Sequence, residues 1–317
     1  MKSKYSTGVI FCLIATLSWG GMFPVMTSAL TRVDPFHFTA IRYAIAGLAF
    51  ALLLLMKEGW KSFSLKGERV FLAWVLGTAG FAGFGFLMFL GQQLAGPTGA
   101  LTASIISATV PLLSVLANWA IRGVKPAKAT TGFILMSFVG VVLVITDGNI
   151  SAMLSHPASF AAYLPLVAGA LCWVVYTLGV SFFPAWSPYR YTTLTTILGL
   201  SSVFFVTIFL NLSGYIVTPG AADLAAIAPH LFYMSLVAGV IGVLSWNMGN
   251  NIITPLNGVL FMDVVPLTTF IISALTGIVP HPVQIGGACI TAAALILNNV
   301  YQRRRLAALL KASALPA

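Results

Sequence analysis

Charged residues are scarce in this 317-residue chain, where Asp, Glu, Lys and Arg together make up only 7% of the sequence. Soluble domains carry roughly 25% charged residues. Because 59% of the residues are hydrophobic, a water-soluble form would expose a very large apolar surface. The composition therefore excludes an ordinary soluble protein and indicates that lipid surrounds most of the chain.

The sequence also lacks most residues that chemistry at a site would require. It has no Gly-x-x-x-x-Gly-Lys-Ser/Thr loop, so direct use of ATP is not expected. Cys12, Cys172 and Cys289 each lie in an apolar run, without metal-ligand or disulfide spacing. An enzyme would need an acid–base pair, and the apolar runs offer one central carboxylate, Asp263, with no histidine beside it. We expect no enzymatic activity, no metal and no cofactor.

Long apolar runs are what the sequence has instead. A membrane-spanning helix needs about 20 mostly apolar residues. Ten such runs are separated by short connections that contain Pro, Gly, Asp or Asn. They cover residues 8–30, 36–56, 70–91, 98–121, 128–146, 160–182, 189–211, 228–246, 254–277 and 283–301. The sequence predicts an all-α integral membrane protein with ten transmembrane helices.

Basic residues outnumber acidic ones, with 16 Lys and Arg against 6 Asp and Glu. They form short clusters between the apolar runs, which favours a role in membrane topology over nucleic-acid binding. With a cytoplasmic N-terminus, every Lys and Arg except Arg32 and Arg42 falls on the cytoplasmic side. We therefore expect a multi-pass inner-membrane protein with both termini in the cytoplasm.

An internal repeat with an offset of 155 residues relates the two halves of the chain. The matching pairs are Gln92 with Asn247, Ala103 with Gly258, Pro111 with Pro266 and Gly132 with Gly287. Trp19 and Trp173 correspond at nearly the same offset. Each half holds five apolar runs, so the second half enters the membrane with inverted orientation. We expect one repeat over 1–148 and a second over 149–317, the latter with a short basic tail, around a central cavity.

These features carry a resemblance to a known family. The residues that carry it are the Trp19-Gly20 region, Arg42 in the second run, and a late pattern in each half of Ala or Gly, then Pro111 or Pro266, then Gly132 or Gly287. On them the chain resembles the EamA family of the drug/metabolite transporter superfamily. It looks most similar to bacterial exporters of aromatic and other neutral amino acids. The resemblance implies a basket-like helical bundle around a cavity that binds a small solute.

Two charged residues within the apolar runs are candidate substrate contacts. Arg42 would hold a substrate carboxylate; the alternatives are a pair with Asp34, a bond to a backbone carbonyl, or extension toward the membrane interface. Asp263 would couple transport to protons or hold an ammonium group; the alternative is capping of the half-helix near Pro266. The repeat counterparts of both are uncharged, so neither charge is a symmetric scaffold element.

Aromatic and amide side chains complete the expected site. Trp19, Trp173 and Tyr176 would form walls for a planar or apolar group, although such residues also serve in packing and interfacial belts. Trp246 fits such a belt better. Gln92 and Asn247 would make polar contacts to an amino acid or a gate, or would merely cap helix ends.

The hypothesis that follows is a secondary transporter that exports neutral or aromatic amino acids by alternating access. Pro111 and Pro266 would kink their spans and act as hinges; the alternative is a fixed kink. Another small metabolite or drug as substrate, such as a nucleoside, a sugar derivative or an organic cation, remains open, and a channel or a membrane-embedded enzyme fits less well. We expect the lipid bilayer and a small solute as partners, no nucleic acid, and a monomer.

Overall fold

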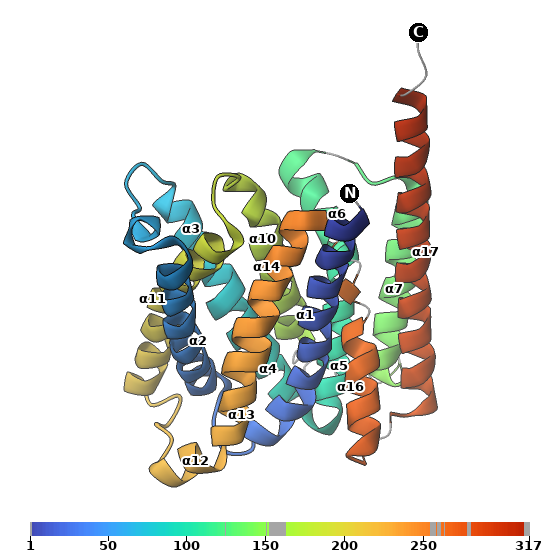
Figure 1. Ribbon diagram of the computed structural model, residues 1–317. Coiled ribbons are helices and arrows are strands. Elements are labelled where there is room, and N and C mark those ends of the chain that lie inside the picture. Colours follow the sequence, from blue (N-terminus) through green and yellow to red (C-terminus); the bar gives the residue numbers. More distant parts are fainter. Residues whose placement is uncertain are drawn as a thin grey trace.

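The chain folds into an all-helical bundle (Figure 1). The computed structural model describes residues 2–123, 125–149, 151, 163–253, 258, 261–262, 264–277 and 280–313. In the first half the helices are α1 (Lys2–Ala29), α2 (Pro35–Glu58), η1 (Trp60–Phe63), α3 (Val70–Gly77), η2 (Thr78–Gly83), α4 (Phe84–Leu94), η3 (Gly96–Thr98), α5 (Gly99–Ala108), α6 (Val110–Arg122) and α7 (Lys128–Thr146). In the second half they are α10 (Tyr163–Gly179), η4 (Val180–Phe182), α11 (Pro188–Leu212), α12 (Ala221–Ala226), α13 (Ala228–Phe232), η5 (Tyr233–Gly242), α14 (Val243–Ile253), α16 (Val264–Leu275) and α17 (Pro282–Ser313).

The expected membrane-spanning segments are present as helices in the described part of the chain. Seven continuous helices there are long and apolar enough to cross a membrane. A further pair, α5 and α6, passes the same test together but is bent by 47°. Two shorter apolar helices cover 264–275 and 282–298. In order along the chain, these segments follow the ten runs, which confirms the fold class of a helical membrane protein.

Local sequence explains where the spans begin and end. The side chain of Asp34 accepts hydrogen bonds from the backbone N–H groups of Phe36 and His37, and Pro35 opens α2. Ser187 caps α11 in the same way, ahead of Pro188. Asp and Ser satisfy free N–H groups at a helix start, where proline costs no hydrogen bond. Gly59 ends α2 with φ 75°, a backbone conformation that favours glycine.

Two spans contain a wide-turn π-helical segment, η2 and η5. They begin at Thr78 and Tyr233, which stand 155 positions apart, the offset of the sequence repeat. Such segments interrupt the regular ladder of backbone hydrogen bonds and occur frequently at functional sites. Both halves therefore depart from α-helical geometry at corresponding positions of the third and eighth spans.

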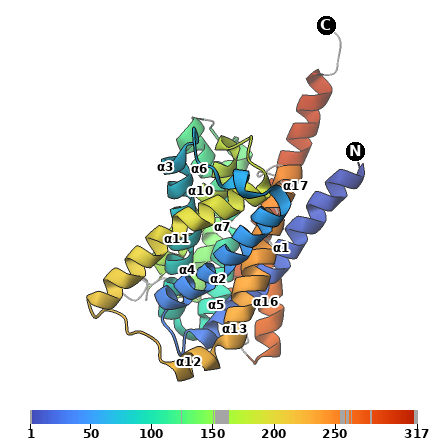
Figure 2. The same ribbon diagram turned by 60° about the vertical axis from the view of Figure 1, so that its left-hand side comes forward.

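Helix packing follows a matched pattern in the two halves. The first span, α1, packs on α14 and α16, while the sixth, α10, packs on α4 and α6. Three further pairs join the halves directly: α2 with α11, α5 with α16, and α7 with α17. Figure 2 shows α2 lying along α11 as both cross the molecule. In Figure 1, α7 and α17 lie together at one edge of the bundle.

Glycines allow two helix pairs, α3 with α11 and α7 with α17, to meet backbone to backbone. A methyl group on Gly77 of α3 would overlap the carbonyl oxygen of Thr195 in α11, and one on Gly199 would overlap the backbone of Gly77. Between α7 and α17, a methyl on Gly140 would stand 2.6 Å from the carbonyl oxygen of Gly287. Small residues permit this close approach in membrane helices, where packing drives association.

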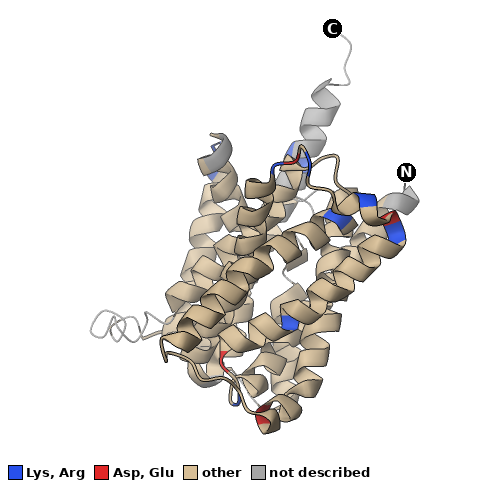
Figure 3. Ribbon diagram, turned by 90° about the vertical axis from the view of Figure 1, so that its left-hand side faces the viewer, with Lys and Arg blue, Asp and Glu red and all other residues tan. Residues whose placement is uncertain are grey.

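The first and last helices reach the same end of the bundle, where the N- and C-terminal ends of the chain lie (Figure 1). Lys and Arg also gather toward that end (Figure 3). There Arg190 holds the segment between α2 and α3 through hydrogen bonds to the carbonyl oxygens of Ser62 and Ser64 and an ion pair with Glu68 at 3.0 Å. The α2–α3 connection is therefore fixed to the start of α11.

Candidate functional site

A small cavity lies among the central helices. Its lining residues come from both halves of the chain. They are Trp19, Met22, Phe23, Arg42, Tyr43, Phe84, Ser107, Val110, Trp173, Val243, Met262 and Val265. Its volume is about 20 Å³, which is room for about one water molecule. The cavity is therefore closed around Arg42 in this conformation and would have to widen to hold a larger solute.

Arg42 provides the charge of this cavity. Its side chain is 2% exposed, and its Nη2 donates a hydrogen bond of 2.7 Å to Tyr43 Oη. The guanidinium carbon lies 4.3 Å from the centre of the Tyr43 ring and 5.2 Å from that of Phe89. Its Nε is buried without a hydrogen-bond partner, and no ion pair to Arg42 occurs within the described ranges. The charge is thus held by aromatic faces and one phenol, with a donor left over.

The alternatives considered for Arg42 are not what the structure shows. Asp34 caps α2 and contacts His37 Nδ1 at 2.6 Å, so it does not pair with Arg42. Extension toward the interface is excluded by the nearly complete burial of the side chain. Among the described residues, the hydrogen-bond acceptors of Arg42 are Tyr43 Oη and, at 4.0 Å, the sulfur of Met22, and neither is a backbone carbonyl.

The expected aromatic residues meet at the cavity. The rings of Trp19 and Trp173 stand edge to face with centroids 5.1 Å apart, and Tyr176 stacks behind Trp173 at 5.1 Å. The ring of Phe84 also contacts Trp173, with centroids 5.2 Å apart. Trp19 and Trp173 line the cavity itself, whereas Tyr176 does not. The wall of the site is therefore built from equivalent tryptophans of the two halves, with Tyr176 as support.

The two tryptophans differ at the indole nitrogen. Trp19 Nε1 donates a hydrogen bond of 3.0 Å to the carbonyl oxygen of Ala238, which lies in the π-helical segment η5. Trp173 Nε1 is buried and has no hydrogen-bond partner. Buried polar groups are normally satisfied, so an unpaired donor on a cavity wall marks a position for a ligand or a water. Arg42 Nε and Trp173 Nε1 are two such donors on one cavity.

The amides Gln92 and Asn247 link helices and do not line the cavity. Gln92 Nε2 in α4 donates to the carbonyl oxygen of Phe23 at 2.7 Å and to Thr27 Oγ1 at 3.0 Å, both in α1. Asn247 Nδ2 in α14 donates to Tyr176 Oη at 2.8 Å and to Thr192 Oγ1 at 2.7 Å. Each amide therefore sits behind the cavity and fixes residues that support it.

The remaining expected positions fall around this centre. Pro111 stands in the first turn of α6, just beyond the 47° bend, and its neighbour Val110 lines the cavity. Pro266 lines a separate apolar groove between α5, α16 and α17, with a volume of about 240 Å³. Asp263 lies outside the described residues, although Met262 before it lines the cavity.

Sequence reasoning missed part of the site. Trp246 suits an interfacial belt only if the eighth span ends there, but α14 continues to Ile253. Trp246 is instead fully buried, with its ring 5.2 Å from that of Trp19. Tyr43 and Ser107 were also missed. Each stands within a turn of a residue that had been chosen, Arg42 or Pro111, which is the signal that would have found them.

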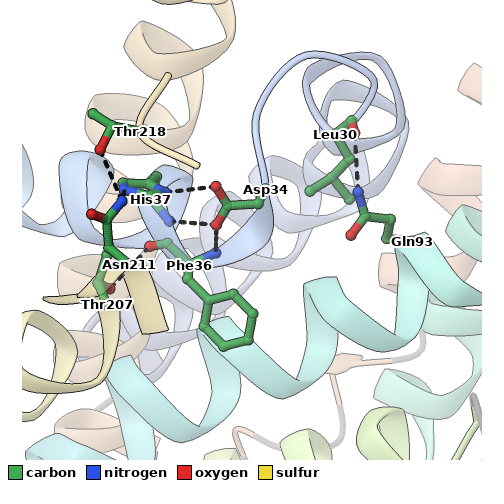
Figure 4. Close-up of polar contacts among 8 residues, drawn as sticks. All are labelled: Leu30, Asp34, Phe36, His37, Gln93, Thr207, Asn211 and Thr218. Atoms are coloured by element: carbon green, nitrogen blue, oxygen red, sulfur yellow. Dashed lines mark hydrogen bonds and ion pairs between the residues drawn. The ribbon is translucent and has the colours of Figure 1, made fainter. Parts of the chain in front are cut away.

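A second polar cluster lies at the end of the bundle away from the termini, where His37 joins α2 to α11 (Figure 4). His37 Nδ1 contacts Asp34, while Asn211 Nδ2 lies 3.3 Å from His37 Nε2 and donates to Thr218 Oγ1 at 2.8 Å. The Nδ1-protonated tautomer satisfies both ring contacts, because its Nε2 can accept from Asn211. This cluster is separate from the cavity and holds the loop after α1 in place.

Comparison with known proteins agrees with the sequence and the fold. Residues 6–146 match the EamA-like transporter family. The chain is also 41% identical over 305 residues to the uncharacterized transporter YrdR of Bacillus subtilis (strain 168), covering 96% of this chain and 94% of that protein. The chain belongs to the EamA-like transporter family. This confirms the resemblance drawn from Trp19, Arg42 and the paired prolines.

Other matches to this EamA-family transporter extend over most of its length. A second protein of Bacillus subtilis (strain 168), the uncharacterized transporter YyaM, is 29% identical over 287 residues and covers 90% of this chain and 91% of its own. A solved crystal structure of a protein superimposes with a TM-score of 0.64 at 20% identity, covering 94% of this chain and 98% of that one. At that identity the likeness shows a shared fold.

Proposed function

We propose that this EamA-family transporter exports neutral amino acids, aromatic ones included, by alternating access, and that the central cavity closes around the substrate. The observation that carries the proposal is the buried guanidinium of Arg42, whose Nε lacks a partner, on a cavity that Trp173 also lines with an unpaired indole N–H. A carboxylate is the group that a positive charge and two unpaired donors would bind best.

The energetics of Arg42 favour an anionic substrate group. Placing an arginine in the centre of a membrane helix costs roughly 2.5–3.5 kcal/mol, and such residues commonly mark substrate pathways. Tyr43 Oη and the rings of Tyr43 and Phe89 offset part of that cost without neutralising the charge. The same charge would repel an organic cation, which makes that alternative substrate class the least compatible with the site.

The rest of the wall suits an amino-acid side chain. Trp19, Phe84 and Trp173 present ring surfaces, and Val110 and Val243 add aliphatic ones. Ser107 lines the cavity as well, with its hydroxyl 3.9 Å from the sulfur of Met88. Apolar walls with a few placed polar groups are typical of small-molecule sites.

The volume of about 20 Å³ requires a conformational change before an amino acid can enter. We assign the hinges to Pro111 and Pro266, and the moving parts to inverted repeats over 1–148 and 149–317. The 47° bend before Pro111 supports the first hinge. The matched packing of α1 on α14 and of α10 on α4 supports the inverted arrangement. So does the distance of 155 residues between the starts of η2 and η5, which equals the offset of the sequence repeat.

We further assign cytoplasmic termini, a location in the inner membrane and a monomeric state. The gathering of Lys and Arg at the end that carries both termini supports this orientation (Figure 3). For Asp263, the proposal of proton coupling rests on the sequence, where it is the central acidic residue of the ninth apolar run. If it couples, Asp263→Asn reduces uptake driven by a pH gradient while exchange of substrate across the membrane persists.

The test is flux in liposomes that contain the purified protein. Labelled amino acids, nucleosides, sugars and an organic cation are compared with and without a pH gradient. We expect saturable flux of neutral amino acids, little flux of amino-acid amides that lack the carboxylate, and loss of flux in Arg42→Gln. Arg32→Gln is the matched control, because Arg32 is exposed in the loop after α1. Equal flux of acids and amides, or normal flux in Arg42→Gln, would overturn the assignment.

A further inference from the structure

A second pocket opens at the end of the bundle away from the termini. Its volume is about 270 Å³, far more than that of the central cavity. Four of its six lining residues carry hydroxyl or amide groups. They are Thr27, Leu30, Thr31, Gln92, Gln93 and Gly96, from the ends of α1 and α4 and the turns that follow each of them. This outer pocket is polar enough to hold water or a hydrated solute.

Gln92 lines the outer pocket and is bonded to a residue of the central cavity wall. Its amide nitrogen donates to the carbonyl oxygen of Phe23, a residue of the cavity wall, and to Thr27, a residue of the outer pocket. A hydrogen-bonded contact between α4 and α1 therefore connects a residue of the outer pocket with a residue of the cavity wall. Gln93 adds a second link nearer the surface, a hydrogen bond of 3.2 Å to the carbonyl oxygen of Leu30 (Figure 4).

The amide oxygen of Gln92, Oε1, is unusual because it is buried without a hydrogen-bond partner. The carbonyl of Phe23 can only accept a hydrogen bond, so the atom that faces it must be the amide nitrogen. The amide oxygen Oε1 is then left buried without a partner, on a side chain that is 2% exposed. An unsatisfied buried acceptor is destabilising, so it would be relieved by a donor that arrives in the pocket.

We propose that Gln92 is the outer gate of the transport path. In the closed state its bonds to Phe23 and Thr27 hold α4 against α1. When they break, the outer pocket joins the central cavity, and Oε1 accepts a hydrogen bond from the ammonium group of the passing solute. This inference rests on the proposed function for the direction and the nature of the solute, but the closed contact can be tested without any substrate.

The gate is tested by cysteine labelling. Cys12, Cys172 and Cys289 are replaced by alanine, and Ser107→Cys places a thiol on the wall of the central cavity. Right-side-out and inside-out vesicles are treated with a membrane-impermeant maleimide. Gln92→Leu should raise the labelling rate at least five-fold from the side opposite the termini and leave it unchanged from the other side.

Two further variants keep this test decisive. Asn211→Leu is the matched control, since Asn211 is an amide at the same end of the bundle but joins α11 to Thr218 and His37, and its labelling rate should stay near that of the parent. Gln92→Glu keeps the size of the side chain but cannot donate to Phe23 when ionised, so it should also raise labelling if Gln92→Leu fails to fold. Unchanged labelling in a folded Gln92 variant overturns the gate.

The acceptor role of Oε1 has its own readout. A cysteine placed at Thr31, which is exposed in the outer pocket, should be protected from the maleimide by phenylalanine but not by 3-phenylpropanoate, which lacks the ammonium group. Equal protection by both compounds, or by neither, overturns the acceptor role. The proposed function fails separately, through the liposome flux assay, because labelling of Ser107→Cys requires no transported solute.

Discussion

The indole rings of Trp19 and Trp173 meet edge to face, with their centroids 5.1 Å apart and their planes at 86°. These residues occupy corresponding positions in the two halves of the chain and nevertheless have different polar environments. The N–H of Trp19 donates a hydrogen bond to the carbonyl oxygen of Ala238, whereas the N–H of Trp173 has no partner. Two corresponding tryptophans therefore give the cavity wall one bonded N–H and one free N–H.

Replacement of Trp173 by phenylalanine keeps an aromatic wall and removes the free N–H. Because a hydrogen bond to a charged group contributes about 1.5–3 kcal/mol, we expect substrate to bind roughly ten-fold more weakly or worse. Binding is measured by isothermal titration calorimetry or by the substrate dependence of flux. The melting temperature should fall less than in Trp19→Phe, since both changes remove buried ring volume but the Trp173 donor has no partner to lose.

The same change at the partner ring should give the opposite pattern. Trp19→Phe leaves the carbonyl of Ala238 without its side-chain donor, so the melting temperature in detergent should fall. A larger loss of stability in Trp173→Phe than in Trp19→Phe would contradict this division of roles.

Tyr43→Phe tests the support of the Arg42 charge. The ring that lies 4.3 Å from the guanidinium remains, but the acceptor at 2.7 Å is lost and a second buried N–H is left unpaired. We expect a loss of about 1–3 kcal/mol in stability, measured as a lower melting temperature. Added amino-acid substrate should restore part of it, because its carboxylate would occupy the released donor. Identical melting of the variant and its parent would show that Tyr43 Oη does not stabilise the charge.

The close contact between α3 and α11 is tested by replacing a glycine with alanine. Gly77→Ala should prevent α3 and α11 from meeting, and the variant should lose its monodisperse peak on size-exclusion chromatography. Gly132→Ala is the control, because nothing lies within 4 Å of a methyl group at that position of α7. Since alanine favours a helix over glycine, this variant should be as stable as its parent or slightly more so. Equal behaviour of the two variants would contradict the close backbone contact.

Asp34 offers a test at the outer end of α2. Asp34→Ala removes the acceptor for two backbone N–H groups and should cost about 0.5–2 kcal/mol. Asp34→Asn retains a capping oxygen, so it should recover most of that loss and leave only the contact with His37 weakened. Thermal melting of the two variants separates the cap from the His37 contact, and equal losses would assign the effect to that contact alone.

The sequence predicted much of this molecule because lipid imposes simple rules. Apolar length identified the spans, and Asp34-Pro35 and Ser187-Pro188 mark helix starts that the structure has. Arg42, Trp19 and Trp173 were found because a charge or a repeated indole within a span is conspicuous. The cavity walls from Val110, Val243 and Val265 could not be predicted, since valine is ordinary everywhere in such a chain.

The amides show why polar residues near a boundary mislead. The run after Trp246 looks like the end of a span because Asn247, Asn250 and Asn251 are polar. In the structure α14 continues, since Asn247 donates to Tyr176 and Thr192 and Asn250 donates to the carbonyl of Trp246. Other helices supply the partners of Asn247, and α14 itself supplies that of Asn250. A single sequence does not say which helices approach Asn247.

The wide turns at Thr78–Gly83 and Tyr233–Gly242 have a consequence for ancestry. One additional residue in a helix widens a turn and rotates every side chain beyond it. Such an insertion is retained only where the helices packed against it tolerate the rotation. Descent of the two halves from a single five-helix ancestor would place that insertion before the gene doubled. The irregular third helix would then be older than the transporter in its present length.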